Sequence, residues 1–395
     1  MKSVFLRKIA SKMHQVKSSL LVYLNFPELR STRKASNEEI HLKAAMAWLC
    51  LAQDESKCDG ILSLYNLDKK SWGKPYRETT GYIIPTFINY SKKSGIKEFE
   101  ERALRMGEWE LKEQLNDGSY GEETISGQIR KKVFNTGQVM LGLCSLYDHT
   151  GEEKYLKAVI KSAEWLLSIQ ENNGSWQQFT TAGARTYHSR VAWSLLEVYK
   201  RTGNKKYKEA AEKNIEWVLA QQNENGWFEN TSLSNPSKPW THLIAYTIQG
   251  LIESASLLES DKIFQSAYKT SLKILRYYEN EKNNNFDYLP GTFDKKWQSK
   301  DDYTCLTGDA QIAITWLKIW NITNEEHFRS RALCIIDQIK ETQIINSSHP
   351  EITGGIAGSY PFGGEYASFT MLNWATKFFI DALLLKNNPE FSLLG

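Results

Sequence analysis

The apolar and polar residues of this chain are arranged in long helical segments that come in pairs. The first helix of a pair is apolar on nearly every side, as in TGQVMLGLCSLY at 136–147 and VAWSLLEVY at 191–199. The second has one apolar face and a face rich in Lys and Glu, as in EEKYLKAVIKSAEWLLSIQ at 152–170. A helix that is apolar all round is buried, whereas an amphipathic helix covers a core. The pattern therefore predicts a buried inner helix followed by an outer helix in each pair.

A tryptophan marks the outer helix of three successive pairs and recurs about every 50 residues, at Trp109, Trp165 and Trp217. Each tryptophan begins the pattern Trp-x-x-x-x-Gln, which is followed by a polar turn containing Gly and an aromatic residue. The two helices of these pairs are separated by tight turns with a glycine, at Gly95, Gly151 and Gly203. Glycine adopts left-handed backbone at low cost, so we expect it to end each inner helix. Apolar residues at helical spacing are usually core, so we interpret the tryptophans as wall contacts that lock neighbouring units together.

The remaining helices complete a ring. Further pairs are predicted at 240–258 with 262–280 and at 304–320 with 326–342. The helix at 37–53 has no partner before it, and the helix at 366–386 has none after it. Pairing these two gives an all-α fold, an (α/α)6 toroid of six helical hairpins in which the last inner helix closes onto the first outer helix. We expect one toroid domain over residues 36–390, preceded by a basic amphipathic segment over residues 1–35.

Composition excludes several classes of function. The 395-residue chain has 49 Lys and Arg against 46 Asp and Glu, a balance that does not favour nucleic acid as a partner. Its five cysteines are scattered without C-x-x-C spacing, which argues against a disulfide framework or zinc site and favours a cytoplasmic location. We expect neither a metal nor another cofactor.

The first 25 residues have the features of a helix that lies on a membrane surface. Lys and Arg precede the first acidic residue, Glu28, and apolar residues from Val4 to Leu20 follow helical spacing. A basic amphipathic helix binds anionic membrane surfaces, although the same pattern also suits a helix docked on its own protein. The first alternative predicts a peripheral membrane association through residues 1–25. We identify no secretory signal and no apolar run of the roughly 20 residues that would span a bilayer.

Polar side chains gather where the inner helices begin, although inner helices should be apolar. In a ring of hairpins, these starts meet at one mouth of the central cavity, and helix N-termini suit anionic ligands. The six starts lie at 76–82, 133–138, 187–193, 240–246, 305–311 and 370–375. Candidates for catalysis are His188, Asp309, Glu78 and His242. Candidates for substrate binding, in these starts or the loops nearby, are Arg190, Tyr187, Trp193, Trp240, Tyr246, Asn135, Gln138, Tyr288, Asn373, Trp374 and Arg130.

This mixture of side chains suits a sugar. Aromatic rings stack on sugar faces, polar groups bond to hydroxyls, and arginines hold carboxylates bidentately, which favours an acidic sugar. Structural roles remain open for several candidates. A histidine at a helix start is often a hydrogen-bonded part of the scaffold, and Asp309 also suits the positive end of a helix dipole.

The Trp-x-x-x-x-Gln…Gly-x-Trp units resemble those of the α/α-toroid superfamilies, across residues 37–387. These comprise the six-hairpin glycosidase-like enzymes and the terpenoid cyclase and prenyltransferase group. The chain is also similar to a poorly characterised bacterial family associated with surface-polysaccharide biosynthesis, in the segments ETTGYIIPTF (78–87), FNTGQVMLGL (134–143), GGIAGSYP (354–361) and LNWATKFFIDALL (372–384). The Asp-x-Asp-Asp motif of class II cyclases is absent, and no Cys lies near a His as a prenyltransferase zinc site requires. A terpenoid cyclase-like enzyme is therefore disfavoured, and the resemblance implies a carbohydrate-active toroid.

The leading expectation is an enzyme that cleaves an acidic bacterial surface polysaccharide or oligosaccharide in the central cavity, as a hydrolase or a lyase. Hydrolysis requires a carboxylic acid and a carboxylate on either side of the scissile bond, for which Glu78 and Asp309 are the best candidates. Lyase or uronate C5-epimerase chemistry instead requires a base such as His188 or His242. Epimerisation is one alternative, and a non-catalytic protein of glycan binding or assembly is another.

Overall fold

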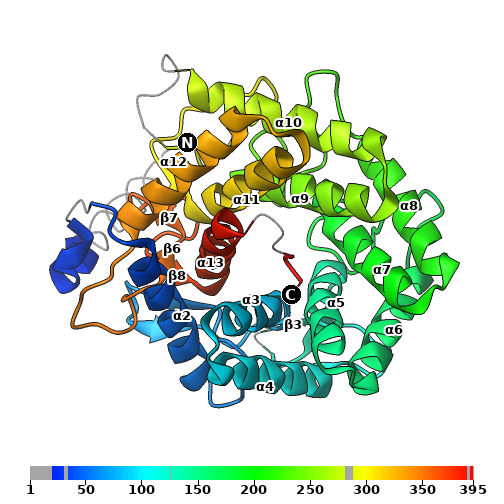
Figure 1. Cartoon of the computed structure of the whole chain (residues 1–395), viewed down its shortest axis with the longest axis horizontal. Coiled ribbons are helices and arrows are strands. Elements are labelled where there is room, and N and C mark those ends of the chain that lie inside the picture. The colour runs from blue at the N-terminus through cyan, green and yellow to red at the C-terminus, as the bar shows by residue number, and fades with distance from the viewer. Residues whose placement is uncertain (1–19, 31–33, 125, 281–287, 389–391, 395) are drawn as a thin grey trace, which may run out of the picture.

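The computed structural model describes residues 20–30, 34–124, 126–280, 288–388 and 392–394. Most of the basic amphipathic segment predicted at 1–25 lies outside these residues. The described helices form two concentric rings (Figure 1). The inner ring consists of α3 (Arg77–Ser94), α5 (Val133–Thr150), α7 (Ser189–Thr202), α9 (Thr241–Leu258), α11 (Leu306–Thr323) and α13 (Asn373–Asn387). The outer ring consists of α2 (Glu38–Asp54), α4 (Lys97–Glu113), α6 (Glu153–Ser168), α8 (Lys205–Leu219), α10 (Asp261–Glu279) and α12 (Glu326–Thr342).

The ring closes through the last helix. Helix α13 packs against its inner neighbours α11 and α3 and against the outer helix α2. Lys386 near the end of α13 forms an ion pair with Glu38 at the start of α2, with 2.5 Å between Nζ and Oε2. The predicted (α/α)6 toroid, with its last inner helix closed onto the first outer helix, is confirmed.

Glycine ends the inner helices as the sequence predicts. Gly95, Gly151 and Gly203 follow α3, α5 and α7 with φ angles of 71°, 71° and 68°. A Cβ at any of them would meet no atom within 4 Å, so the requirement is conformational and not steric. Each glycine N–H donates to a carbonyl of the last helical turn, which stops the helix and turns the chain outward.

Glutamines tie five of the six outer helices to the next one. The Gln170 Nε2 after α6 donates to the carbonyl oxygen of Ala210 in α8, at 2.9 Å, and to that of Gly174, at 3.0 Å. Four further glutamines bond in the same way to a carbonyl of the following outer helix: Gln53 to Arg102, Gln114 to Ala158, Gln222 to Ser266 and Gln343 to His41. These bonds satisfy buried polar groups and fix the spacing of the outer wall.

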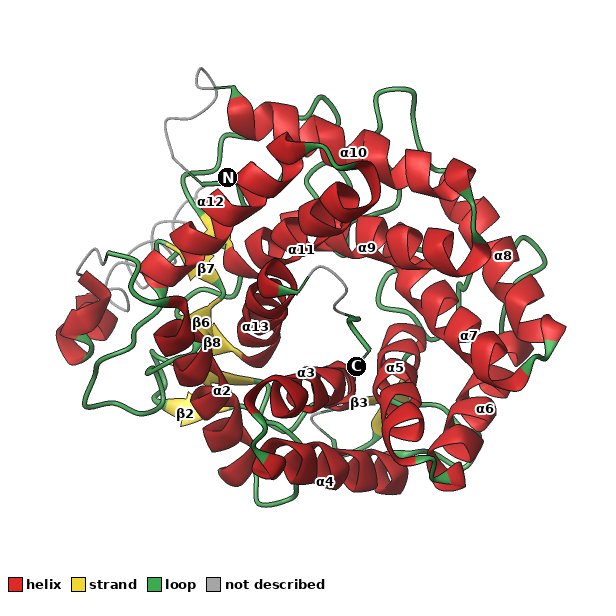
Figure 2. Ribbon diagram, viewed as in Figure 1, coloured by secondary structure: helices red, strands yellow, loops and turns green. Residues whose placement is uncertain are grey.

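Short strands lie in the connections that lead from outer to inner helices (Figure 2). They are β1 (Leu64–Asn66), β2 (Ser71–Trp72), β3 (Gly121–Glu123), β4 (Ile129–Lys131), β5 (Thr304–Cys305), β6 (Ile356–Ala357), β7 (Ser359–Tyr360) and β8 (Thr370–Leu372). One sheet has the antiparallel order β2-β1-β8-β6, and β3–β4 and β5–β7 form separate pairs. Two 3-10 turns, η1 (Pro27–Arg30) and η2 (Thr186–His188), complete the described elements. The strands were not predicted, and they shape the mouth at which the inner helices begin.

The opposite mouth of the toroid is occupied by the end of the chain. The side-chain amide of Asn89, near the C-terminal end of α3, donates to the Ser392 carbonyl at 3.0 Å. Leu393 and Leu394 are buried in the same core as the inner helices. Residues 392–394 therefore lie inside the ring, where Figure 1 shows them in red. None of the helices among the described residues is both long and apolar enough to cross a membrane.

Candidate active site

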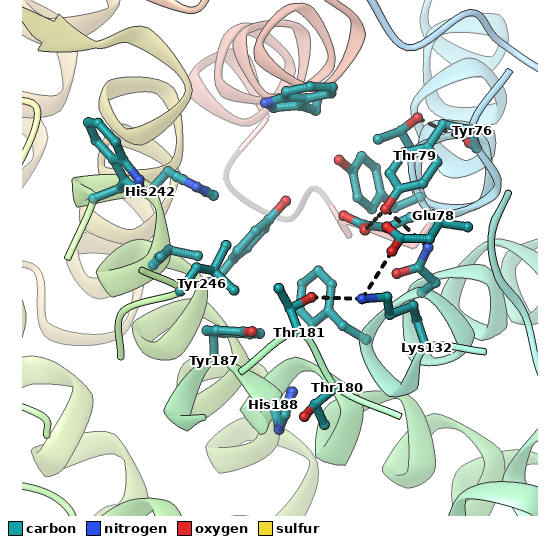
Figure 3. A pocket seen from close by; sticks show the side chains of 18 of the residues that line it. Tyr76, Glu78, Thr79, Lys132, Thr180, Thr181, Tyr187, His188, His242 and Tyr246 are labelled. Atoms are coloured by element: carbon teal, nitrogen blue, oxygen red, sulfur yellow. Dashed lines mark hydrogen bonds and ion pairs between the residues drawn. The ribbon is translucent and has the colours of Figure 1, made fainter. Parts of the chain in front are cut away.

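A cavity of about 280 Å³ lies where the inner helices begin. Eight of the predicted site residues line it: Glu78, Asn135, Tyr187, His188, Trp240, His242, Tyr246 and Trp374. Figure 3 shows Tyr76, Glu78 and Lys132 on one side of the cavity and Tyr187, His242 and Tyr246 on the other. We call these sides the carboxylate wall and the aromatic wall.

Glu78 is the central group of the carboxylate wall. It stands in the first turn of α3, and its Oε2 accepts a hydrogen bond of 3.0 Å from the Tyr76 hydroxyl. The Asn135 amide of α5 donates in turn to the Tyr76 oxygen, at 3.1 Å, which fixes the tyrosine in place. Burial raises the pKa of Glu78 to about 7, although the hydrogen bond from Tyr76 and the charges of Arg190 and Lys132 act in the opposite direction. This carboxyl group can therefore hold or release a proton near neutral pH.

The hairpin of β3 and β4 adds a second carboxylate to the same wall. Glu122 lies in β3, and Lys132 directly follows β4, so the pairing of the two strands brings both side chains to the cavity. The buried Lys132 Nζ lies 3.2 Å from Glu122 Oε1 and donates to Thr181 Oγ1 at 3.1 Å. The wall thus combines a carboxyl group of raised pKa with a carboxylate held in an ion pair.

The aromatic wall offers flat faces from several elements. The Tyr366 ring lies 5.3 Å from Trp240 and 4.9 Å from His242, and its hydroxyl accepts a 3.0 Å hydrogen bond from Trp374 Nε1. Deeper in the cavity, the Phe134 ring contacts Tyr187 and Tyr246, each at 5.2 Å between centroids. Such rings stack on the apolar faces of sugars while their polar edges bond to hydroxyls.

The two histidines of the cavity are neutral. Burial lowers the pKa of His242 to about 3, and burial together with the nearby Arg185 lowers that of His188 to about 3. His188 Nδ1 accepts the Arg185 backbone N–H at 3.4 Å, whereas the buried His242 Nδ1 has no partner in the described structure. A neutral imidazole can accept a proton or bond to a hydroxyl.

Some predicted residues lie beneath the cavity instead of lining it. Arg190 is fully buried and donates through Nε to Gln138 Oε1 at 2.7 Å. Trp193, one turn along α7, is buried and donates to Glu197 at 3.2 Å. Asp309 is buried in the first turn of α11, where Oδ2 accepts a 2.6 Å bond from Thr304 and burial raises its pKa. The contact of Arg190 connects α7 to α5, whereas those of Trp193 and Asp309 are local.

Three further predicted residues lie at other places around the mouth. The Asn373 amide is buried and donates to the Leu62 carbonyl and to Thr79 Oγ1. Tyr288 packs against Tyr360, with 5.4 Å between ring centroids. The exposed Arg130 lies in an open groove that shares Glu122 with the cavity, 3.7 Å from that carboxylate. The roles of all predicted site residues stay predictions.

Sequence reasoning did not select several residues that line the cavity, among them Tyr76, Glu122, Lys132, Thr181 and Tyr366. Tyr76 lies within the predicted start at 76–82 but was not selected, and Lys132 directly precedes the start at 133–138, so a rule that included the residue before each helix would have found both. Glu122 and Tyr366 come from connections whose course depends on strand pairing. No group of three or more His, Cys, Asp or Glu among the described residues is arranged to hold a metal ion.

Solved structures of the six-hairpin glycosidase type are similar to this chain. An unsaturated glucuronyl hydrolase specific for heparin aligns with a TM-score of 0.71 and 15% identity, over 89% of this chain and 96% of that one. An unsaturated glucuronyl hydrolase from Bacillus sp. GL1 aligns with a TM-score of 0.71 and 14% identity, over 89% of this chain and 97% of that one. Cellobiose 2-epimerase from Bacillus thermoamylovorans aligns with a TM-score of 0.69 and 11% identity, over 88% of this chain and 97% of that one. At these identities the likeness establishes the toroid fold.

No curated protein matches the chain. A family model does match it, that of the β-L-arabinofuranosidase GH127 catalytic domain, over residues 78–366. The match begins at Glu78 and ends at Tyr366, so it spans the residues that line most of the cavity. The association with surface polysaccharides stays a prediction. The chain is a carbohydrate-active enzyme, and it belongs to the family of the β-L-arabinofuranosidase GH127 catalytic domain.

Proposed function

We propose that the protein is a glycoside hydrolase in which Glu78 is the general acid. The observation that carries the proposal is the raised pKa of Glu78, about 7, in a cavity that also holds a second carboxylate, Glu122. A glycosidase needs one carboxyl group that is protonated, to give its proton to the leaving oxygen, and one that is ionised. Glu78 takes the first role, and Glu122, in its ion pair with Lys132, takes the second.

The cavity favours the end of a saccharide over the middle of a chain. Its volume of about 280 Å³ lies just below the roughly 300–1,000 Å³ of typical ligand pockets, which suits one or two sugar units. Arg190 and its buried neighbours fill the space beneath it, and Leu393 and Leu394 occupy the far mouth. A polymer would therefore enter by one end and stack its terminal sugar on the aromatic wall.

For the substrate we propose an acidic oligosaccharide, derived from a bacterial surface polysaccharide. The support is electrostatic. Among the described residues that line the cavity, Lys132 alone is a lysine or arginine, and it has Thr181 beside it as a second polar contact. A sugar carboxylate could share Lys132 with Glu122. Replacing Lys132 by Met should then raise KM for a uronate substrate more than for its methyl ester.

The first experiment is incubation with a panel of acidic and neutral oligosaccharides in deuterated water, read by mass spectrometry and by absorbance of unsaturated sugars. New reducing ends without unsaturation would support hydrolysis, and their loss in the Glu78→Gln variant would tie the reaction to this residue. Binding without any turnover on the whole panel would contradict the proposal.

A uronate C5-epimerase or lyase is the second candidate, because two neutral histidines line the cavity and one of them, His242, lies across it from Glu78. Either reaction removes the proton beside a uronate carboxylate, for which a neutral imidazole is a competent base. Deuterium at C5 without cleavage would indicate epimerisation, and unsaturated ends would indicate elimination.

We also propose that the N-terminal segment binds membrane surfaces. The support is that Leu20, Leu21 and Leu24, which follow the basic segment in sequence, are 59%, 47% and 61% exposed. Co-sedimentation with vesicles of phosphatidylcholine and phosphatidylglycerol should carry the protein down at low salt. A variant with Ser at these three positions should stay in the supernatant, and equal sedimentation of both proteins would contradict the proposal.

A further inference from the structure

Arg190 is a buried cation that the proposed reaction does not use directly. It extends from α7 beneath the cavity and is 1% exposed. Nε donates to Gln138 of α5 at 2.7 Å, and Nη1 donates to Gln249 of α9. Both acceptors are neutral amides. Among the described residues, no carboxylate forms an ion pair with this guanidinium.

An arginine in such a place carries a cost. Moving a charge out of water costs several kcal/mol even after the protein relaxes, and an ion pair is the usual compensation. Here the compensation comes from amide oxygens and from aromatic rings. The guanidinium carbon lies 4.9 Å from the Tyr246 ring centroid, 5.2 Å from Trp193 and 5.9 Å from Phe378. Such contacts stabilise the cation without neutralising it.

The contacts of Arg190 lead upward to the cavity. Tyr246, whose ring stacks on the guanidinium, lines the cavity itself. Gln138, Gln249 and Phe378 come from α5, α9 and α13, so Arg190 joins four inner helices at one point below the sugar site. A feature that serves only packing could be apolar at this position.

We propose that Arg190 is a positioning residue of the active site, which fixes Tyr246 as the floor of the sugar site and places a positive charge without an ion-pair partner beneath the cavity that holds Glu78. The inference rests on the proposed function, because it takes Glu78 as the general acid. The position of the Arg190 charge is independent of that function. Arg190 touches no reacting atom in this proposal, and it acts through Tyr246 and through its field.

The effect of the Arg190 charge on the pKa of Glu78 has to be separated from the effects of the other groups around Glu78. The titratable and charged groups that act on Glu78 are Tyr76, Tyr82, Glu122, Lys132, Tyr187, Arg190 and Tyr246. Arg190 and Lys132 lower the pKa of Glu78, whereas burial and Glu122 raise it. Removing the charge of Arg190 should therefore keep Glu78 protonated to higher pH.

Gln249→Glu tests this with little change of shape. The new carboxylate would neutralise Arg190 and leave its stack on Tyr246 in place. Arg190→Met removes both the charge and the hydrogen bonds, and Arg190→Lys keeps the charge. The midpoint of Glu78 is read by ¹³C NMR of glutamate-labelled protein, with Glu78→Gln to assign the signal. We expect Gln249→Glu and Arg190→Met to move the midpoint upward by roughly 1 pH unit, the size typical of one nearby charge. Arg190→Lys should stay near the wild-type midpoint.

The matched control is Arg201→Met. Arg201 lies on the same helix with a side chain only 4% exposed, but it has ion pairs with Glu197 and Asp148. Its loss should lower stability without moving the Glu78 midpoint. An unchanged midpoint in folded Gln249→Glu would overturn the inference, whether or not Arg190→Met folds.

A pH–rate profile adds the catalytic readout. The alkaline limb of kcat/KM should move upward with the NMR midpoint in Gln249→Glu and Arg190→Met, which a purely structural role would not cause. Because the titration needs no substrate, the two proposals fail separately. A shifted midpoint with no hydrolysis on any sugar would contradict the proposed function alone, and hydrolysis with an unshifted midpoint would contradict the role of Arg190 alone.

Discussion

The outer wall and the cavity both bury polar side chains, but they bond them in opposite ways. The wall glutamines each donate to a backbone carbonyl of the next helix, as Gln170 does to Ala210. In the cavity, Glu78 has a raised pKa, and His242 Nδ1 is buried without a partner in the described structure. A satisfied polar group stabilises the fold, whereas a buried and under-bonded one costs free energy and is available to a ligand. We therefore expect the polar residues of the outer wall to hold the helices together and those of the cavity to act on a ligand.

The sharpest test of this division is Glu78→Gln. The variant keeps the shape and the acceptor for Tyr76 but loses the acidic proton. We expect kcat to fall by about 10²–10⁴-fold, the usual contribution of a general acid. Glu123→Gln, one residue from Glu122 but outside the cavity, is the control and should retain activity. Activity within tenfold of wild type for Glu78→Gln would place the acid elsewhere.

The pH dependence gives the next largest effect. A general acid must be protonated, and the pKa of Glu78 is about 7, so kcat/KM should fall about tenfold per pH unit above that value. The same shift affects folding. Because the folded pKa lies above the unfolded one, the stability that Glu78 contributes is complete below about pH 4.5 and is lost as the pH rises through about 7. Thermal unfolding of wild type and Glu78→Gln across this range measures the difference.

Variants of the two cavity histidines test whether these residues contact the substrate or act as the catalytic base. If the protein is a hydrolase, His188→Gln and His242→Gln should each reduce kcat by less than tenfold, because they would lose one contact to substrate. Their pKa values near 3 predict no change of charge between pH 5 and 8. Steady-state kinetics on the hydrolysed substrate check this. A loss of about 10²-fold or more in either variant would favour a base-catalysed reaction.

Gln170→Ala tests the wall. The change leaves the Ala210 carbonyl without its side-chain donor, and we expect the free energy of unfolding to fall by about 1–3 kcal/mol. Turnover at a temperature well below unfolding should be unchanged. Gln265→Ala, at an exposed site of α10, is the control and should stay within about 0.5 kcal/mol. A large loss of kcat in Gln170→Ala would show that this wall residue also affects catalysis, which would contradict the division between wall and cavity.

Glu110 is an exception within the outer wall, and replacing it should affect stability but not activity. This residue of α4 is fully buried, neither of its carboxyl oxygens has a partner in the described structure, and burial raises its pKa well above 4.5. Wild type should therefore lose stability as the pH rises above about 4.5 and toward the raised value. Glu110→Gln should flatten that slope without changing kcat, as denaturant unfolding at several pH values would reveal. If the free energy of unfolding depended on pH in the same way in Glu110→Gln, Glu110 would not be the source of that dependence.

The ring itself could be predicted because its signals repeat. Glycine ends α3, α5 and α7 in left-handed backbone, and the apolar inner helices and amphipathic outer helices differ along their whole length. Closure of α13 onto α2 followed from counting unpaired helices. Such features depend on local sequence and on burial, which a single sequence records.

The cavity was predicted only in part because its lining depends on directions that spacing does not define. His188 and Arg190 are two residues apart, yet one lines the cavity and the other points beneath it. Glu122 reaches the cavity from the local hairpin of β3 and β4, and Tyr366 follows β7, whose pairing partner β5 is distant in sequence. The starts of the inner helices correctly predicted at which end of the toroid the cavity lies. Only the packed structure separates the side chains that line the cavity from those that lie beneath it.

The closure of the ring also has a consequence for how the protein is made. Helix α2 is synthesised long before α13, the helix that covers its inner side. Until then the flank of α3 that α13 covers also remains open to solvent. Exposed apolar surface of this kind makes unfinished chains prone to aggregate. A chain that stops before Asn373 would have no closed ring, so we expect it to be degraded or held by chaperones instead of accumulating as a smaller toroid.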